Sequence, residues 1–154
     1  MNMHFSALAV TLVLSATSSQ AAAKDLAGIA DFVRPAYIAM NFTVMCAKQD
    51  PWFLSDTSGP RGTSLHYAEH VKDEAIDQLN AAEAVTVLRL AADAARSVAR
   101  AKLYELAQSR DDLSAAIAIK RWCDSEGKHF ILEVIRRHDS EHPVAEQFLE
   151  RAKR

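Results

Sequence analysis

Residues 81–108 read AAEAVTVLRLAADAARSVARAKLYELAQ and contain neither glycine nor proline. Apolar side chains recur in this stretch every three or four positions, which is the spacing of one helix face. They form two neighbouring seams, and a surface so broad and so rich in alanine predicts a central helix that other helices contact closely on two sides. The seams comprise Val85, Leu88, Ala92, Ala95, Ala99 and Leu106, and Val87, Ala91, Ala94, Val98 and Ala101.

The sequence before this stretch predicts two more helices. Asn80 and Glu83 have the spacing of a capping box, so a helix over residues 63–79 is expected to end just before the central one. Another helix is expected over residues 25–49, where Pro35 either kinks it or begins its main part.

The sequence after it predicts one long helix and one short one. The long helix, over residues 111–137, contains Gly127, which weakens a helix by about 1 kcal/mol relative to alanine and therefore marks a kink or a close helix contact. The short helix covers residues 143–153 and is expected to bury Val144, Phe148 and Leu149. Together these segments predict an all-α fold, an antiparallel helical bundle of four main helices plus a short C-terminal helix.

Residues 1–23 have the composition of a secretory signal peptide. The run from Phe5 to Ala16 (FSALAVTLVLSA) is apolar and uncharged, and small residues lead up to a cleavage site after Ala23 or Ala21. A membrane span needs about 20 apolar residues, so this shorter run predicts a cleaved signal peptide rather than an anchor. Residues 24–154 are then expected to form a single helical-bundle domain without an integral membrane segment, located in the periplasm or secreted.

The chain has two cysteines, Cys46 and Cys123. Both fall on the apolar faces of predicted helices, one turn after Phe42 and Ile119 respectively. In an oxidising compartment such a pair favours one disulfide bond, which would stabilise the fold by about 4 kcal/mol by closing a long loop. Two buried free thiols are the alternative, because cysteine is also a common core residue.

The charged residues are balanced, with 18 basic and 20 acidic side chains and a formal net charge of −2. This balance provides no basic footprint for nucleic acid, so a nucleic-acid partner is not expected. Arg89, Arg96 and Arg100 form a basic stripe on the helix over residues 81–108. Asp93 lies within one turn of Arg89 and Arg96, which favours a solvated, ion-paired face over a surface for an acidic partner.

Two segments share the pattern H-x-x-E-H, one from His66 to His70 and one from His138 to His142. On a helix this spacing places two imidazoles one turn apart with the glutamate beside them. The pattern resembles the motif of the inverzincin metallopeptidases, in which the histidines bind zinc and the glutamate acts as general base. Those enzymes need a further acidic ligand downstream, which this sequence does not identify. Enzymatic activity is therefore not predicted.

The sequence favours metal binding without catalysis over peptidase activity for these histidines. Two pairs from different helices could supply four nitrogen ligands to zinc or copper, with carboxylates in reserve. The residues of this alternative site are His66, His70, Asp73, His138 and His142. His142 precedes Pro143, which disfavours helical geometry there, and a charged, solvated helix flank explains the first pair as well.

The stretch from Trp52 to Gly62 (WFLSDTSGPRG) is the longest predicted loop. Trp52, Phe53 and Leu54 are expected to fold back and cover one end of the bundle, which leaves the rest of the loop exposed for a partner. Its candidate partner-binding residues are Ser55, Asp56 and Arg61.

The sequence as a whole lacks the motifs of nucleophilic, nucleotide and haem chemistry. It therefore predicts a small exported protein without enzymatic activity or cofactor, which binds a protein or small-molecule partner in the cell envelope. A periplasmic zinc-binding or copper-binding protein is the alternative function.

Overall fold

The computed structural model describes residues 24–108, 110–140, 146, 148, 150 and 151. Within these residues the regular elements are helices, without an extended strand, which confirms the all-α prediction. None of the described helices combines the length and the apolar composition that crossing a membrane requires. The predicted signal peptide, residues 1–23, lies outside the described residues. The elements are α1 Leu26–Ala47, α2 Phe53–Asp56, α3 Ser64–Gln78, α4 Ala81–Ala107, α5 Asp112–Trp122, the π-helical segment η1 Cys123–Gly127, and α6 Lys128–Ser140.

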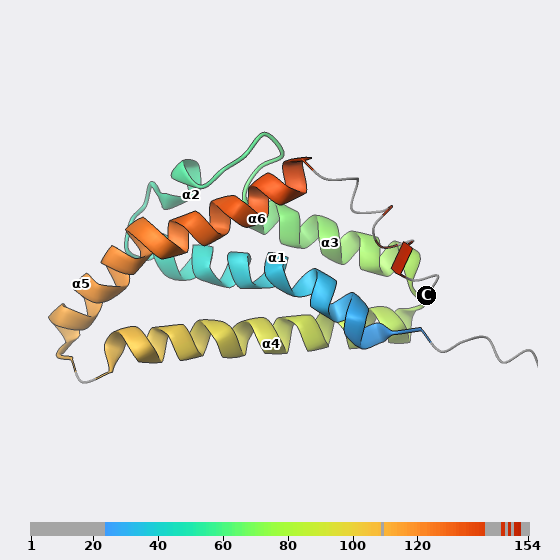
Figure 1. The fold of residues 1–154 in the computed structure, drawn as a ribbon, viewed down its shortest axis with the longest axis horizontal. Coiled ribbons are helices and arrows are strands. Elements are labelled where there is room, and N and C mark those ends of the chain that lie inside the picture. The colour runs from blue at the N-terminus through green and yellow to red at the C-terminus, as the bar shows by residue number, and fades with distance from the viewer. Residues whose placement is uncertain (1–23, 109, 141–145, 147, 149, 152–154) are drawn as a thin grey trace, which may run out of the picture.

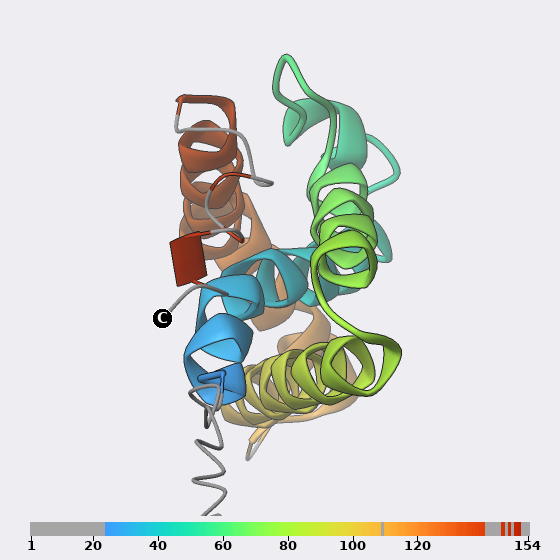
Figure 2. The same ribbon diagram turned by 90° about the vertical axis from the view of Figure 1, so that its right-hand side faces the viewer.

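Helix α1 lies in the middle of the fold, with α3 and α6 on one side and α4 on the other. Seen along the helices, α6 and α3 lie side by side on one side of α1, and α4 lies on the other side (Figure 2). Consecutive long helices reverse direction, whereas α1 and α4 run in the same direction (Figure 1). Helix α1 is continuous through Pro35 and bends near its middle, as expected where proline removes one backbone hydrogen bond.

The central helix is α1, and the prediction that residues 81–108 occupy that position is wrong. Helix α4 buries one face only, formed by Ala84, Val87, Ala91 and Ala95. Val85 and Val98, which belong to the predicted seams, are 65% and 41% exposed. A sequence pattern counts alanine as apolar at every position, although its small side chain is compatible with both core and surface. An alanine-rich helix therefore looks two-sided in sequence even when one side faces solvent.

The predicted capping box at the start of α4 is confirmed. The Asn80 side chain accepts a hydrogen bond from the Glu83 backbone N–H (2.9 Å), and the Glu83 carboxylate accepts one from the Asn80 backbone N–H (3.1 Å). Lys24 also donates to Glu83 (2.9 Å), and these bonds, led by that from Lys24, lower the pKa of the Glu83 carboxyl below its ordinary value. Because the folded-state pKa is the lower one, this contribution to stability is present above the unfolded-state pKa and disappears as the pH falls through the folded-state pKa.

Helix α1 contributes to two apolar clusters, one for each of its halves. Ile29 and Val33 of its first half pack with α3, the start of α4 and Phe148. Phe148 is fully buried, as predicted, and meets Phe32 edge to face with ring centroids 5.4 Å apart. The other two predicted anchors of the C-terminal helix, Val144 and Leu149, lie outside the described residues.

The second cluster contains the disulfide bond predicted between Cys46 and Cys123, and that prediction is confirmed. The Cα atoms of the two cysteines are 5.5 Å apart, and the bond joins the last turn of α1 to the first residue of η1. Phe42, one turn before Cys46, meets Trp122 edge to face at 4.8 Å and Phe130 at 5.6 Å. Aromatic packing and a covalent bond therefore hold the end of α1 to the helical run from Trp122 to Phe130.

The helix predicted over residues 111–137 is interrupted by η1, and the interruption depends on Gly127. A Cβ atom on Gly127 would come within 2.8 Å of the Trp122 indole, which lies one π-turn earlier in the chain. The sequence predicts either a kink or a close helix contact at Gly127. The structure has both, and the residue that Gly127 contacts belongs to the same helical run. The bend lets α5 pack on α4 while α6 packs on α1 and α3 (Figure 1).

Substitution of Gly127→Ala is expected to destabilise the fold by about 1–3 kcal/mol, because the new methyl group must displace a buried indole. In an ordinary helix the same change stabilises by about 1 kcal/mol, so the sign is diagnostic. Urea unfolding followed by circular dichroism measures the change. The penalty should shrink in a Trp122→Leu background, and a more stable Gly127→Ala protein would show that the close contact is unimportant.

Candidate functional site

The loop between α2 and α3 has its own network of hydrogen bonds. The Thr57 hydroxyl donates to the Phe53 carbonyl (2.7 Å), and the Ser58 hydroxyl donates to the Ser55 carbonyl (2.9 Å). Gly59 and Gly62 exchange two backbone hydrogen bonds of 2.8 and 2.9 Å across a tight turn. Gly62 has a φ of 105°, which other residues rarely adopt. The loop is therefore held in one shape before any partner arrives.

The segment that carries this loop, residues 52–62, contacts the rest of the molecule at two points, both in α2. Phe53 is 3% exposed and belongs to the second apolar cluster, as predicted for a residue covering one end of the helices. Trp52 is 74% exposed, so the prediction that it also packs there is wrong. One buried aromatic side chain is enough to close this end, and α2 turns Trp52 outward. Asp56 accepts an ion-paired hydrogen bond from Lys128 at the start of α6 (3.2 Å).

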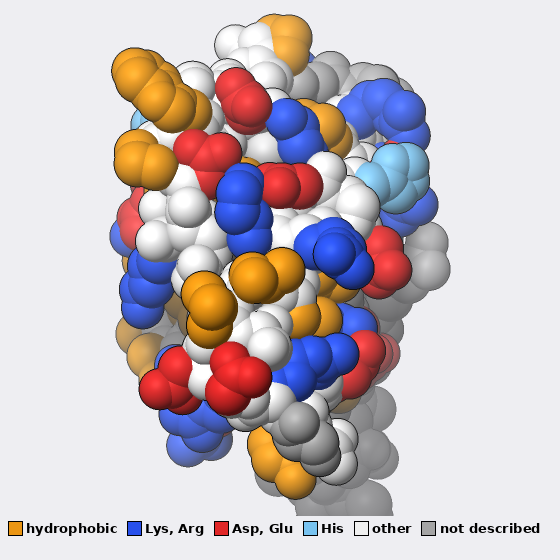
Figure 3. Space-filling view, turned by 90° about the vertical axis from the view of Figure 1, so that its left-hand side faces the viewer, with side chains coloured by type: hydrophobic (Ala, Val, Ile, Leu, Met, Phe, Trp, Pro, Cys, Tyr) orange, Lys and Arg blue, Asp and Glu red, His pale blue; other side chains and the backbone are white. Residues whose placement is uncertain are grey.

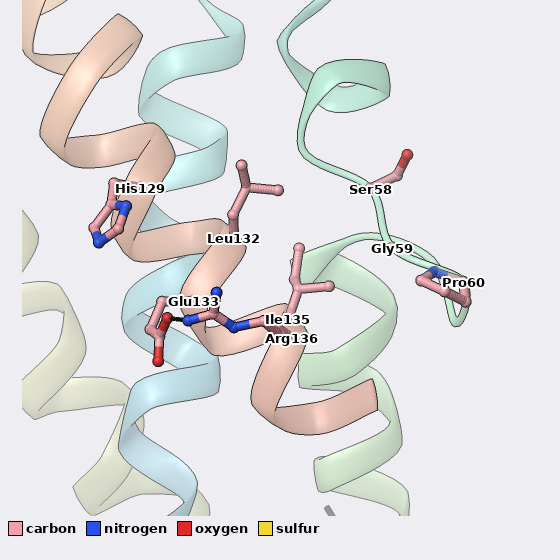
Figure 4. A pocket seen from close by; sticks show the side chains of 8 residues that line it. All are labelled: Ser58, Gly59, Pro60, His129, Leu132, Glu133, Ile135 and Arg136. Atoms are coloured by element: carbon pink, nitrogen blue, oxygen red, sulfur yellow. Dashed lines mark ion pairs between the residues drawn. The ribbon is translucent and has the colours of Figure 1, made fainter. Parts of the chain in front are cut away.

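A groove of about 550 Å³ separates the loop from α6, and we name it the loop–α6 groove. Leu132 and Ile135 point from α6 toward the loop, and Pro60 lies across from them (Figure 4). Ile135 is buried and Leu132 is half-buried, so α6 provides an apolar wall. The lining residues are Ser58, Gly59, Pro60, His129, Leu132, Glu133, Ile135 and Arg136.

The two charged side chains that line the groove, Glu133 and Arg136, form an ion pair with one another. Figure 4 shows the Arg136 guanidinium folded back onto the Glu133 carboxylate. Glu133 also pairs with Arg137 through Nε at 3.2 Å. The polar edge of the groove is therefore an ion-paired cluster on α6.

The residues predicted for partner binding flank this groove and do not line it. Ser55 donates its hydroxyl to the Trp52 carbonyl (2.7 Å), Asp56 pairs with α6, and Arg61 is an exposed residue of the turn. The predicted segment borders the groove, but the residues selected from it are Ser55, Asp56 and Arg61, whereas Gly59 and Pro60 face the groove. That this segment binds a partner stays a prediction. The α6 wall was not predicted at all. Its signal is Leu132, an apolar residue next to the core-facing Ile131 and Ile135.

The first H-x-x-E-H segment lies on α3, and each of its polar side chains has a local partner. The His66 Nδ1 atom accepts a hydrogen bond from the Thr63 backbone N–H (3.2 Å), which caps the helix. Glu69 accepts from Lys72 and thereby raises the pKa of that lysine above its ordinary value. The His70 Nε2 atom lies 3.6 Å from a Glu74 carboxylate oxygen. These contacts give the histidines structural roles on their own helix.

The predicted metal ligands are not brought together among the described residues. Within that part of the chain, no three side chains of histidine, cysteine, aspartate or glutamate form a group that could hold a metal ion. Asp73 lies 3.8 Å from the Lys72 ammonium group and is exposed. The side chains of His138 and His142 lie outside the described residues, so the two-helix metal site stays a prediction.

The end of the molecule formed by α5 carries a mixed surface. Hydrophobic side chains form separate groups among basic and acidic ones on this face (Figure 3). Leu113 and Ile117 of α5 are exposed one turn apart, next to the Lys120–Asp124 ion pair of 3.0 Å. That pair raises the pKa of Lys120 above its ordinary value, chiefly through the hydrogen bond to Asp124.

The lining of the loop–α6 groove contains one serine and one histidine, Ser58 and His129. The Ser58 hydroxyl is engaged by a backbone carbonyl, and His129 lies on the other side of α6 from Leu132, away from the serine (Figure 4). The two side chains do not form the nucleophile and base of a hydrolytic site. No protein-family model, curated protein or solved structure matches this chain.

Proposed function

We propose that this protein is an exported helical bundle with antiparallel consecutive helices, which acts without enzymatic activity by binding a protein partner in the cell envelope. The observation that carries the proposal is the loop–α6 groove, in which Leu132 and Ile135 face a loop that is already ordered. Binding to an ordered site avoids the entropy cost of fixing it, so more of the contact free energy appears as affinity.

Two features support export. The run from Phe5 to Ala16 has the length and composition of a signal-peptide core, and small residues follow it. Disulfide bonds such as the one between Cys46 and Cys123 persist in the periplasm or outside the cell, whereas cytosolic thiols are kept reduced. A periplasmic or secreted location accounts for both.

The groove also indicates the kind of segment that it would hold. An apolar side chain of the partner would fit between Leu132 and Pro60, and polar groups beside it would face the ion pair of Glu133 and Arg136. An apolar centre with a polar rim is the usual composition of a specific interface. We therefore infer a partner segment with one or two apolar side chains flanked by polar residues.

Selection of random peptides displayed on phage against the oxidised protein tests this proposal. The selected peptides should share one or two apolar residues at a fixed spacing. Leu132→Glu should reduce binding at least tenfold, because it places a charge on the apolar wall. The matched control is Trp52→Glu, which adds the same charge to an exposed residue outside the groove.

Two results would contradict the proposal. One is selection of peptides that bind the wild type and the Leu132→Glu protein equally well. The other is failure to select any sequence pattern while the circular dichroism of the protein shows a folded helical domain.

A further inference from the structure

A second groove lies between α1, α4 and α5, on a different face of α1 from the loop–α6 groove. Its volume is about 440 Å³, and small Ala99 of α4 forms part of its wall where a larger side chain would fill it. Met45 and Ile119 add apolar surface from α1 and α5. We name it the α1–α4–α5 groove, and its lining residues are Asn41, Val44, Met45, Lys48, Gln49, Arg96, Ala99, Arg100, Leu103 and Ile119.

All the charged residues that line this groove are basic. Lys48 follows the last turn of α1, and Arg96 and Arg100 lie one turn apart on α4. Asp93, the partner of Arg96, lies on α4 outside the lining. A guanidinium presents several N–H donors in a planar fork, which matches a carboxylate in both charge and shape. The polar part of the groove thus suits a single anionic group.

The remaining surface of the groove is apolar and partly open to solvent. Val44 of α1 is 46% exposed and Leu103 of α4 is 41% exposed. Together with Met45 and Ile119 they flank the basic residues on two helices. A ligand that satisfies both parts must carry a charge at one end and a hydrocarbon chain behind it.

We propose that the α1–α4–α5 groove binds a free long-chain carboxylate. Its head group accepts hydrogen bonds from Arg96 and Arg100, and its chain packs against Val44, Met45 and Leu103. Each added methylene group that fits in the groove should tighten binding about three- to fourfold, as expected from the burial of apolar surface. This site is independent of the partner-binding groove on α6.

Isothermal titration of the oxidised protein with decanoate, dodecanoate and tetradecanoate, below their micelle concentrations, tests the proposal. Affinity should rise along the series, and dodecanol, which lacks the charge, should bind at least tenfold more weakly than dodecanoate. The double substitution Arg96→Gln with Arg100→Gln should weaken dodecanoate binding at least tenfold. Arg89→Gln removes a basic residue from the same helix outside the groove and should leave the affinity unchanged.

The possible outcomes separate this ligand from its alternatives. Equal binding of dodecanol and dodecanoate, or equal binding by the double variant and the wild type, would overturn the proposal. Flotation of the protein with phosphatidylglycerol vesicles, without binding of free dodecanoate, would also overturn it in favour of a membrane surface. Leu132→Glu should leave dodecanoate affinity unchanged, which distinguishes failure at this site from failure at the loop–α6 groove.

Discussion

Reduction of the disulfide bond between Cys46 and Cys123 is expected to lower the free energy of unfolding by about 4 kcal/mol. The bond joins residues that are 77 positions apart, so it removes much of the freedom of the unfolded chain. It also lies inside the second apolar cluster, where both cysteines are buried beside Phe42 and Trp122. A loss of this size is a large fraction of the stability of a domain of this length.

Urea unfolding of the same protein with and without reductant measures this difference. The control is the Cys46→Ala and Cys123→Ala double variant, whose unfolding should not respond to reductant. Alanine is preferable to serine because it adds no polar group to the buried apolar cluster. A midpoint that stays unchanged on complete reduction would show that the bond contributes nothing to the fold.

Substitution of Phe42→Ala is expected to cost about 3–5 kcal/mol. Phe42 is 5% exposed and makes edge-to-face contacts with Trp122 and Phe130, so it joins α1 to α5 and α6 at once. Removing the ring leaves a cavity that three helical segments border, and the disulfide next to it limits how far they can close the space. Chemical unfolding of the oxidised variant provides the measurement.

Two other substitutions on α1 serve as controls for this result. Phe42→Leu keeps most of the apolar volume and should cost less than Phe42→Ala, while the edge-to-face contacts are still lost. Val44→Ala, two positions away on the exposed side, should change stability by less than about 1 kcal/mol. A loss as large for Val44→Ala as for Phe42→Ala would mean that the two faces of α1 are wrongly assigned.

The helices, their caps and the disulfide follow from local sequence, which explains why they could be predicted. The Asn80 capping box and the apolar spacing around Cys46 need no knowledge of the other helices. The position of each helix in the fold is a different matter. Helix α4 was expected at the centre because alanine fits both a core and a surface, and only the packing of α1 between its neighbours decides between the two.

The interruption at η1 could be predicted only in part. Gly127 signals an irregularity in a helix, but the partner that it avoids is Trp122, whose indole reaches it only once the turn widens to π-helical spacing. The choice between a kink and a close contact depends on that geometry. Sequence spacing alone treats the two as alternatives, whereas the structure combines them.

The candidate sites were the least predictable feature because each joins segments that are distant in the chain. The loop was recognised by its glycines and aromatics, but its partner wall contains Leu132 and Ile135 of α6. Arg96 and Arg100 were interpreted as a solvated stripe, and their position beside the apolar side chains of α1 and α5 appears only in the folded chain. Polar motifs such as H-x-x-E-H attract attention in sequence, yet on α3 their side chains serve local contacts.

The central claim is that a partner occupies the loop–α6 groove, and photo-crosslinking in the native envelope tests it most directly. A photoreactive amino acid replaces exposed Pro60, which lines the groove across from Leu132, and in a separate protein it replaces exposed Arg89 on α4. The prediction is a discrete adduct from position 60 that disappears when Leu132→Glu is added, with no such adduct from position 89. The same adducts from both positions, or an adduct that survives Leu132→Glu, would contradict the assignment of the groove as the binding site.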